Sequence, residues 1–100
     1  MRLGILVTTD RHLRDVVGVT KAAVAGGYEV VLFAMDAGTR LLGDPSYTEL
    51  CRLPGVAMSV CEHSAKRHGV ETAGLPREIV CGGQYQNAMM VHGADRVIVL

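Results

Sequence analysis

The chain has 100 residues, and its 10 Lys and Arg residues balance 10 Asp and Glu residues, so the formal net charge at pH 7 is zero. This balance removes the electrostatic attraction that nucleic acids and anionic lipids exert on basic proteins, and an aromatic content of 4% is too low for base stacking. Hydrophobic residues make up 49% of the chain, enough for a packed core. We therefore expect one domain over residues 1–100 that binds neither nucleic acid nor membrane.

The cysteines and the N-terminus indicate the compartment. Three cysteines are too few for a disulfide scaffold, and an odd number cannot pair completely within one chain. The first apolar run stops at Thr8, which is short for a signal peptide, and no apolar stretch approaches the roughly 20 residues of a membrane span. These features predict a soluble, cytoplasmic protein.

The first predicted elements are a strand and a helix. The apolar run Leu3–Val7 predicts a buried strand. Apolar residues at helical spacing follow from Leu13 to Val24, with Asp10 as the expected N-cap and Gly26-Gly27 as the expected end. This is the clearest helix of the sequence.

The next segment predicts a strand, a turn and a helix. The strand is Val30–Ala34, and Asp36-Ala37-Gly38 predicts a turn after it. Asp44 and Pro45 provide a cap and a first-turn proline for a helix that continues to Leu53.

The remaining elements continue the alternation of strands and helices. Strands are expected at Val56–Val60, Ile79–Cys81 and Val97–Leu100, with helices at 62–68 and 84–92 between them. In the last helix, one stripe carries Tyr85, Ala88, Met89 and His92. None of the strands alternates between apolar and polar residues, which is typical of parallel strands covered on both faces.

Together these elements predict an α/β fold. We expect a three-layer α/β/α sandwich around a five-stranded, mainly parallel sheet, with the flavodoxin-like strand order 2-1-3-4-5. Ligands and reactive groups of such sheets gather at the carboxyl ends of the strands. The residues expected at that edge are Thr8-Thr9-Asp10, Asp36, Cys61-Glu62-His63-Ser64 and Cys81-Gly82-Gly83-Gln84.

Cys61 is the strongest candidate for chemistry because it ends a strand and directly precedes a helical segment. Backbone N–H groups at a helix start stabilise a thiolate and lower the pKa of a cysteine. His63 and Ser64 are candidate supporting residues that could supply a proton or a hydrogen bond, whereas Glu62 opposes the thiolate. The alternative is a half-buried cysteine that only packs.

Cys81 is a second candidate, because it ends the neighbouring predicted strand. The two thiols could then face one rim, as a disulfide pair or in a persulfide transfer, but a core cysteine before a glycine turn is the preferred interpretation of Cys81. Cys51 lies among leucines, and we expect it to pack only.

Sequence motifs for metals and cofactors are missing. There is no C-x-x-C or H-E-x-x-H motif, so we predict no metal, and neither glycine-rich nucleotide motif nor a G-x-S-x-G elbow occurs, so we predict no cofactor and no serine hydrolase. A small ligand could still bind at the rim formed by Thr9, Asp10, Asp36 and Gln84.

The segment from Val60 to Val70 resembles the active-cysteine segment of the DsrE/DsrF/TusD-like family of small sulfur-relay proteins. The resemblance extends to Thr9-Asp10, Ala22–Ala25, Phe33–Gly38 and Gly83-Gln84-Tyr85, and so covers nearly the whole chain. It implies a flavodoxin-like fold, assembly into homo-oligomers, and a cysteine, here Cys61, that takes a sulfur atom as a persulfide from a donor protein and passes it to an acceptor protein. The sequence departs from this family at Glu62-His63-Ser64, where small apolar residues are usual.

Three functions follow from these observations. The first is a sulfur carrier or sulfurtransferase-like protein that uses Cys61. The second is a non-catalytic, oligomeric module that binds a small ligand, in which Cys61 merely lines the pocket. The third is a redox protein that pairs Cys61 with Cys81 as a disulfide, and we rank it last.

Overall fold

Five parallel strands form a single sheet in the computed structural model, which describes residues 1–100. The strands are β1 (Arg2–Val7), β2 (Glu29–Ala34), β3 (Val56–Cys61), β4 (Ile79–Gly82) and β5 (Arg96–Val99). The α-helices are α1 (Leu13–Ala25), α2 (Pro45–Thr48), α3 (Glu62–Arg67) and α4 (Gln84–Gly93), and two 3-10 helices, η1 (Asp36–Gly43) and η2 (Glu49–Arg52), flank α2. All five predicted strands are present. No helix combines the length and the hydropathy needed to cross a membrane.

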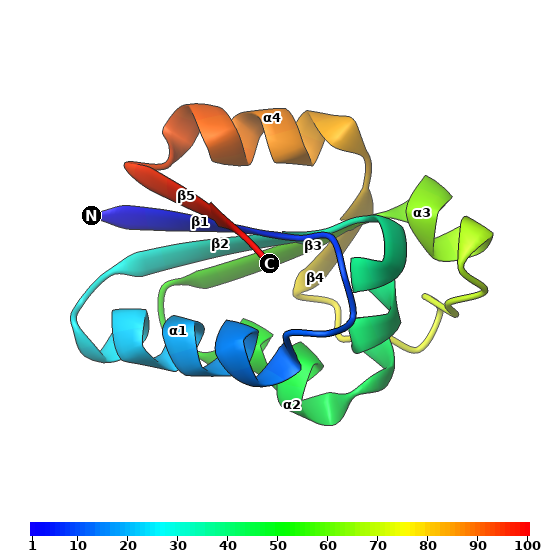
Figure 1. The fold of residues 1–100 in the computed structure, drawn as a ribbon, viewed down its shortest axis with the longest axis horizontal. Helices are drawn as coiled ribbons and strands as arrows, with labels where there is room; N and C mark the ends of the chain where they lie inside the picture. Colours follow the sequence, from blue (N-terminus) through cyan, green and yellow to red (C-terminus); the bar gives the residue numbers. More distant parts are fainter.

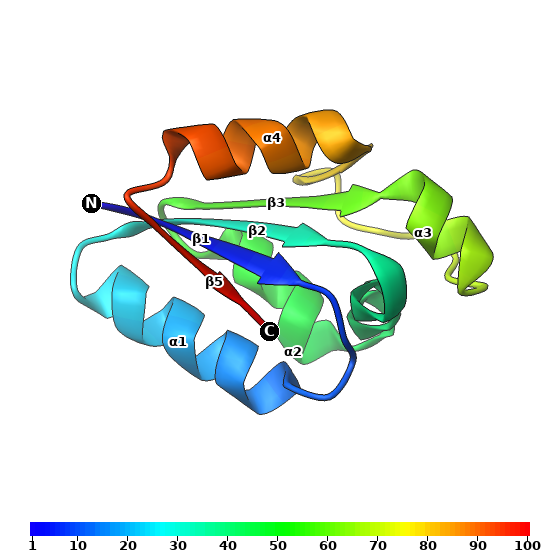
Figure 2. The ribbon, with the colours of Figure 1, turned by 45° about the horizontal axis from the view of Figure 1, so that its top comes forward.

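The helices cover the two faces of the sheet unequally. In Figure 1, α4 lies alone above the sheet, whereas α1 and α2 lie below it. The tilted view in Figure 2 shows the same layers and places α3 beyond the end of β3. The predicted three-layer α/β/α architecture is therefore confirmed, with one thin outer layer.

The strand order differs from the prediction. The order of the strands in the sheet is β4-β3-β2-β1-β5. Strand β3 therefore pairs with β2 and not with β1, so the predicted order 2-1-3-4-5 is wrong. Each connection from β1 to β4 moves one strand in the same direction, and α4 then carries the chain back over the other face to β5. Because crossovers between parallel strands are right-handed, a return in the opposite direction places its helix on the opposite face. Apolar runs identify strands, but they do not encode the direction of these steps.

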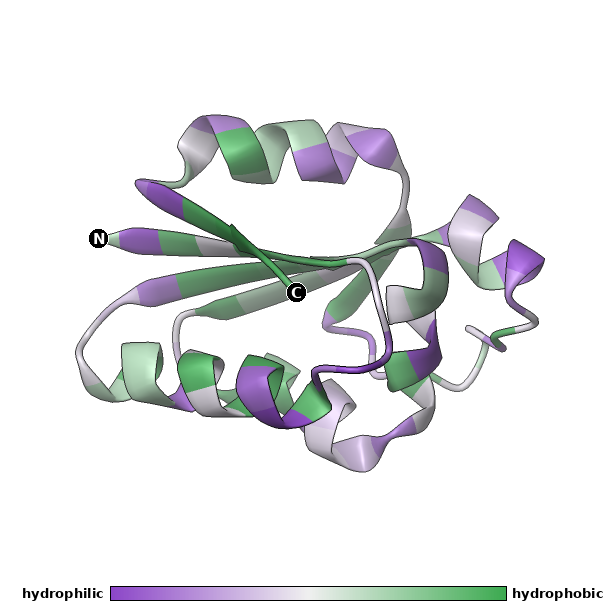
Figure 3. Cartoon of the chain, viewed as in Figure 1, coloured by the Kyte–Doolittle hydropathy of each residue, from purple (hydrophilic) through white to green (hydrophobic).

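The core consists of two parts, one on each face. A cluster of 16 buried residues fills the space between the sheet and the helices α1 and α2 and includes Ile5, Leu32 and Val60. The apolar cluster between the sheet and α4 has only three buried residues, Phe33, Cys61 and Met90. Figure 3 shows the strands as mainly apolar and α4 as a mixture of apolar and polar residues. Consequently, the Cys61 side of the sheet is the less completely covered one.

Two local predictions are also corrected. The predicted helix from Asp44 to Leu53 is the short α2 followed by η2, and the predicted turn at residues 36–38 is the start of η1. Helix α1 has His12 at its N-cap position without a side-chain cap, so Asp10 does not cap it. The Asp10 carboxylate instead pairs with Arg40 Nη1 at 3.5 Å, a partner 30 residues away that local patterns do not reveal.

The apolar residues of α4 do not all face the sheet. Met90 is buried, but Tyr85 and Met89 of the predicted stripe are 71% and 54% exposed, and Val91 is also exposed. The buried Met90 packs closely on β1. Glycine at position 4 allows this contact, because a Cβ there would lie 3.1 Å from Met90 Cγ. The stripe is thus mainly an outer surface.

Candidate functional site

Cys61 lies where β3 ends and α3 begins. It is the last residue of β3 and the N-cap residue of α3, and its side chain is 5% exposed. Alternation along β3 directs Val60 toward α1 and Cys61 toward α4, where Cys61 packs with Phe33 and Met90. The predicted position of Cys61 at a strand-to-helix junction is therefore confirmed.

Opposing effects act on the Cys61 thiol. Burial raises its pKa, but the Ser64 hydroxyl, the backbone N–H groups of Ser64 and His63, and the Gln84 side chain favour the thiolate, and together they hold the pKa below its ordinary value. The thiolate is the nucleophilic form of cysteine. Cys61 therefore combines shelter from solvent with an environment that favours reactivity.

The two predicted supporting residues contribute in different ways. Ser64 is buried and acts through both its hydroxyl and its backbone N–H group. The His63 side chain is exposed, and this residue reaches Cys61 through its backbone N–H group only. Glu62 is also exposed, so its carboxylate has solvent around it.

Gln84 was expected at the rim, and the structure brings it to Cys61. It is the first residue of α4, which starts directly beyond Gly82, the residue that pairs with Cys61 in the sheet. A Cβ on Gly82 would collide with the Gln86 side chain, which accepts a hydrogen bond from the Gly83 N–H at 2.8 Å. Glycine at position 82 thus allows the first turn of α4 to lie close to Cys61.

Cys81 does not face Cys61. It pairs with Val60 in the parallel register, and Gly82 is the residue opposite Cys61. Paired residues of parallel strands point to the same face, so Cys81 projects to the α1 side and Cys61 to the α4 side. The two thiols therefore do not face one rim, and this geometry does not serve a disulfide or a direct sulfur transfer between them. Cys81 is exposed, so the preferred interpretation as a core cysteine is wrong.

The other predicted rim residues, Thr9, Asp10 and Asp36, have contacts of their own. The Thr9 hydroxyl accepts a hydrogen bond from the Arg11 N–H at 3.4 Å, and Asp10 is held by Arg40. Asp36 begins η1 with a φ of 50°, a left-handed conformation that aspartate tolerates. None of these three residues forms a hydrogen bond or an ion pair with Cys61.

No metal site accompanies the thiol. No group of three or more His, Cys, Asp or Glu side chains is arranged to hold a metal ion.

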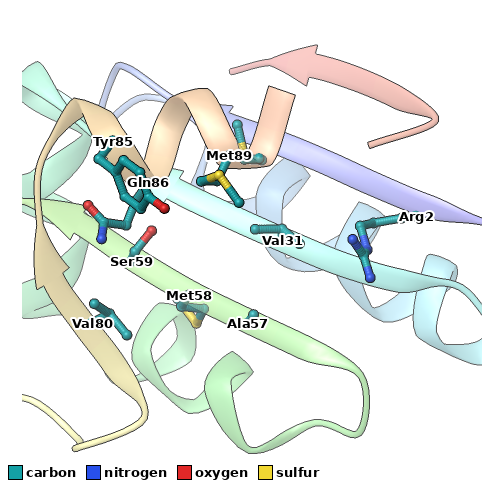
Figure 4. Close-up of a pocket in the computed structure, with 10 residues that line it drawn as sticks. Arg2, Val31, Ala57, Met58, Ser59, Val80, Tyr85, Gln86 and Met89 are labelled. Carbon is teal, nitrogen blue, oxygen red and sulfur yellow. The ribbon is translucent and has the colours of Figure 1, made fainter. Parts of the chain in front are cut away.

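An apolar groove lies on the same side of the sheet as Cys61, between the sheet and α4. Its volume is about 370 Å³, and its lining includes Val31, Ala57, Ser59, Val80, Tyr85 and Met89. Figure 4 shows Tyr85 and Gln86 of α4 above Ser59, while Arg2 lies at the far end of the groove. Ser59 precedes Cys61 by two residues on the same face of β3, but Cys61 itself does not line the groove.

Two residues beside the site, Met35 and Asn87, were not predicted from the sequence. Gln84 Nε2 donates to Met35 Sδ at 3.8 Å, and Asn87 Nδ2 donates to Gln84 Oε1 at 3.1 Å. The spacing of Gln84 and Asn87, three residues apart on a predicted helix, was the available signal. Met35 follows β2 directly, and only the pairing of β2 with β3 places it next to Cys61.

The fold is shared with solved structures of low sequence identity. The YchN protein from E. coli matches with a TM-score of 0.74 and 16% identity over 100% of both chains. MTH1491, a protein of unknown function from Methanobacterium thermoautotrophicum, matches with a TM-score of 0.78 and 14% identity over 99% of this chain and 98% of that chain. No family model and no curated protein matches the sequence. The comparisons therefore establish that the chain has the α/β fold of these two proteins over its whole length.

Proposed function

We propose that the protein is a cysteine-based sulfur carrier, or a sulfurtransferase-like protein, in which Cys61 accepts a sulfur atom from a persulfide. The observation that carries this proposal is the Cys61 thiol itself, sheltered at the end of β3 among donors that lower its pKa. The resemblance of residues 60–70 to the cysteine segment of DsrE/DsrF/TusD-like proteins supports the same role. The donor and the acceptor would be other proteins, and the setting would be the cytoplasm.

The transfer step is an exchange between sulfur atoms. The Cys61 thiolate attacks the terminal sulfur of a donor persulfide, a new S–S bond forms on Cys61, and the S–S bond of the donor breaks. The donor leaves as a thiolate. The proton of the transferred sulfur stays on that sulfur, so Cys61 ends as a protonated persulfide. No external oxidant or reductant is consumed, which suits a site that has no cofactor motif.

Intact-protein mass spectrometry tests this proposal. Wild type and Cys61→Ser are incubated with a low-molecular-weight persulfide, and the products are trapped by alkylation. We expect wild type to gain one sulfur atom and the variant to lose this gain completely, because a serine hydroxyl is not a nucleophile toward sulfur at neutral pH. Cys81→Ser is the matched control and should load like wild type, since Cys81 lies on the other face. Equal loading of wild type and Cys61→Ser would refute the proposal.

The groove favours a second candidate function, a non-catalytic module that binds a small ligand. Its apolar lining with a few polar groups is typical of small-molecule sites. This candidate predicts that an apolar fluorescent probe binds wild type and Cys61→Ser equally and that neither takes up sulfur.

We also propose that the protein forms a homo-oligomer through the α4 side of the sheet. Val80, Tyr85 and Met89 expose a cluster of apolar surface there, beside the edge strand β4. Clusters of this kind mark interfaces in soluble proteins, and a single charge at the centre of an interface opposes association.

Met89→Glu should therefore shift the protein toward the monomer, as measured by light scattering after size-exclusion chromatography. Ala22→Glu adds the same charge to the exposed face of α1 on the other side of the sheet and should leave the mass unchanged. A wild type that is monomeric at high micromolar concentration would contradict the proposed assembly.

A further inference from the structure

Cys61 lies between two flanking segments at the end of the sheet. Strand β3 pairs with β2 on one side and with β4 on the other. Ala34 pairs with Val60, so Met35 follows at the level of Cys61, and Gly82 pairs with Cys61 itself. Alternation along β2 directs Met35 to the α4 side of the sheet, which Cys61 also faces, and Met35 packs there against the cluster that contains Cys61.

A side-chain contact joins these two flanks across the end of β3. Gln84 follows Gly82 by two residues, at the start of α4, and its Nε2 donates a hydrogen bond to Met35 Sδ at 3.8 Å. One partner extends from the β2 flank and the other from the β4 flank. The pair therefore crosses the middle strand at the point where Cys61 ends it. We call this pair of side chains the strap.

The exposure of the side chains fits a cover over the thiol. Cys61 is buried, Met35 is half-buried and Gln84 is exposed. The other two buried members of the cluster, Phe33 and Met90, belong to the core between the sheet and α4. They cannot move aside without unpacking that core, whereas the strap lies at its outer surface and can.

The contact that closes the strap is a weak one. A thioether sulfur is a weak hydrogen-bond acceptor, and both side chains are unbranched with several rotatable bonds. Opening therefore costs one weak hydrogen bond and leaves no buried charge behind. Sulfur exchange requires such an opening, because the donor sulfur has to reach the Cys61 sulfur directly.

We infer that Gln84 and Met35 form a strap that closes over Cys61 and admits small molecules more readily than bulky ones. The inference rests on the proposed function for its biological meaning: the strap shields a persulfide on Cys61 and opens against a donor or acceptor protein. Access to Cys61 is nevertheless a property of the fold, and it can be measured without a sulfur donor.

The test compares two alkylating reagents at one pH. One is iodoacetamide, and the other is an iodoacetamide that carries a bulky fluorescein group, so both react with the same thiolate by the same chemistry. The ratio of their rates at Cys61, bulky over small, therefore reports access and cancels any change in ionisation. The rates are read from the mass of the Cys61 peptide. Circular dichroism and urea denaturation confirm that each variant is folded.

We expect Gln84→Ala and Met35→Ala each to raise this ratio about fivefold, which is the change in a closed-to-open equilibrium that the loss of one hydrogen bond produces. The double variant should resemble the single variants, because either change alone already opens the strap. His63→Ala is the matched control. It removes an exposed side chain two residues from Cys61 that takes no part in the strap, and it should keep the wild-type ratio. An unchanged ratio in Gln84→Ala, an equal rise in His63→Ala, or effects that multiply in the double variant would overturn the inference.

Met35→Gln tests the strap in the opposite direction. Glutamine has a similar length, and its amide oxygen is a stronger acceptor than a thioether sulfur. The strap should then close more firmly, and the ratio should fall below that of wild type. Unfolding raises the ratio, so a loss of structure cannot produce this fall. An equal or higher ratio in folded Met35→Gln would overturn the inference.

The outcomes separate the two proposals. If wild type takes up sulfur and the strap variants keep the wild-type ratio, the inference is overturned and the proposed function remains. If wild type takes up no sulfur but the ratios change as expected, the proposed function is overturned and the strap is supported.

Discussion

Gly38→Ala is expected to destabilise the fold by about 3 kcal/mol or more. Gly38 is buried in η1, and its Cα faces the backbone at the end of β1. A Cβ there would overlap the Val7 carbonyl group and lie 3.1 Å from the Thr8 nitrogen. The backbone cannot move away easily, because Val7 O accepts a hydrogen bond from the Met35 N–H at 2.9 Å. Urea denaturation followed by circular dichroism measures the change.

Gly43→Ala is the matched control for this experiment. Gly43 ends the same 3-10 helix, is exposed, and has no atom within 4 Å of the position of a Cβ. Alanine there should leave the free energy of unfolding within about 1 kcal/mol of wild type, with the change toward higher stability, because it restricts the unfolded chain. If the two variants had equal stability, close packing at Gly38 would not be the reason for its glycine.

The sequence was sufficient for the elements and the layers because both depend on local patterns. Runs such as Val30–Ala34 are so apolar that they predict a strand covered on both faces. Gly26 and Gly69 predict helix ends, because glycine is the usual residue just after a helix. The order of the strands depends instead on which helix crosses which face. That is a long-range property, and the 13-residue α1 would suit either order.

The same distinction explains the outcome at the site. Cys61 was predicted because a strand end and a helix start adjoin in the chain itself. The separation of Cys81 from Cys61 depends on register: one residue of slip would have placed Cys81 opposite Cys61 and on its face. The contacts of Gln84 with Met35 and Asn87 depend on how α4 packs above β2 and β3, so the sequence indicated Gln84 at the edge but not its partners.

Cys61 and Cys51 are expected to react with iodoacetamide at very different rates, although they are almost equally buried, at 5% and 7% exposure. Burial raises the pKa of Cys51, and the nearby Glu78 carboxylate adds to this effect. Donors from Ser64, His63 and Gln84 hold the pKa of Cys61 below its ordinary value despite burial. Below both midpoints, each thiolate fraction rises tenfold per pH unit, so Cys61 should lead at every such pH.

The expected ratio of the two rates at pH 7 is on the order of tenfold, because a thiolate of lower pKa is more abundant but also somewhat less nucleophilic. The ratio should shrink as the pH rises through the Cys61 midpoint, since Cys61 is then fully ionised while Cys51 still gains thiolate. In urea above the unfolding transition, both peptides should react alike, because the differences belong to the fold. Equal rates in the folded protein would mean that solvent access and not ionisation limits the modification of Cys61. Such a result would contradict the stabilised Cys61 thiolate on which the proposed sulfur transfer depends.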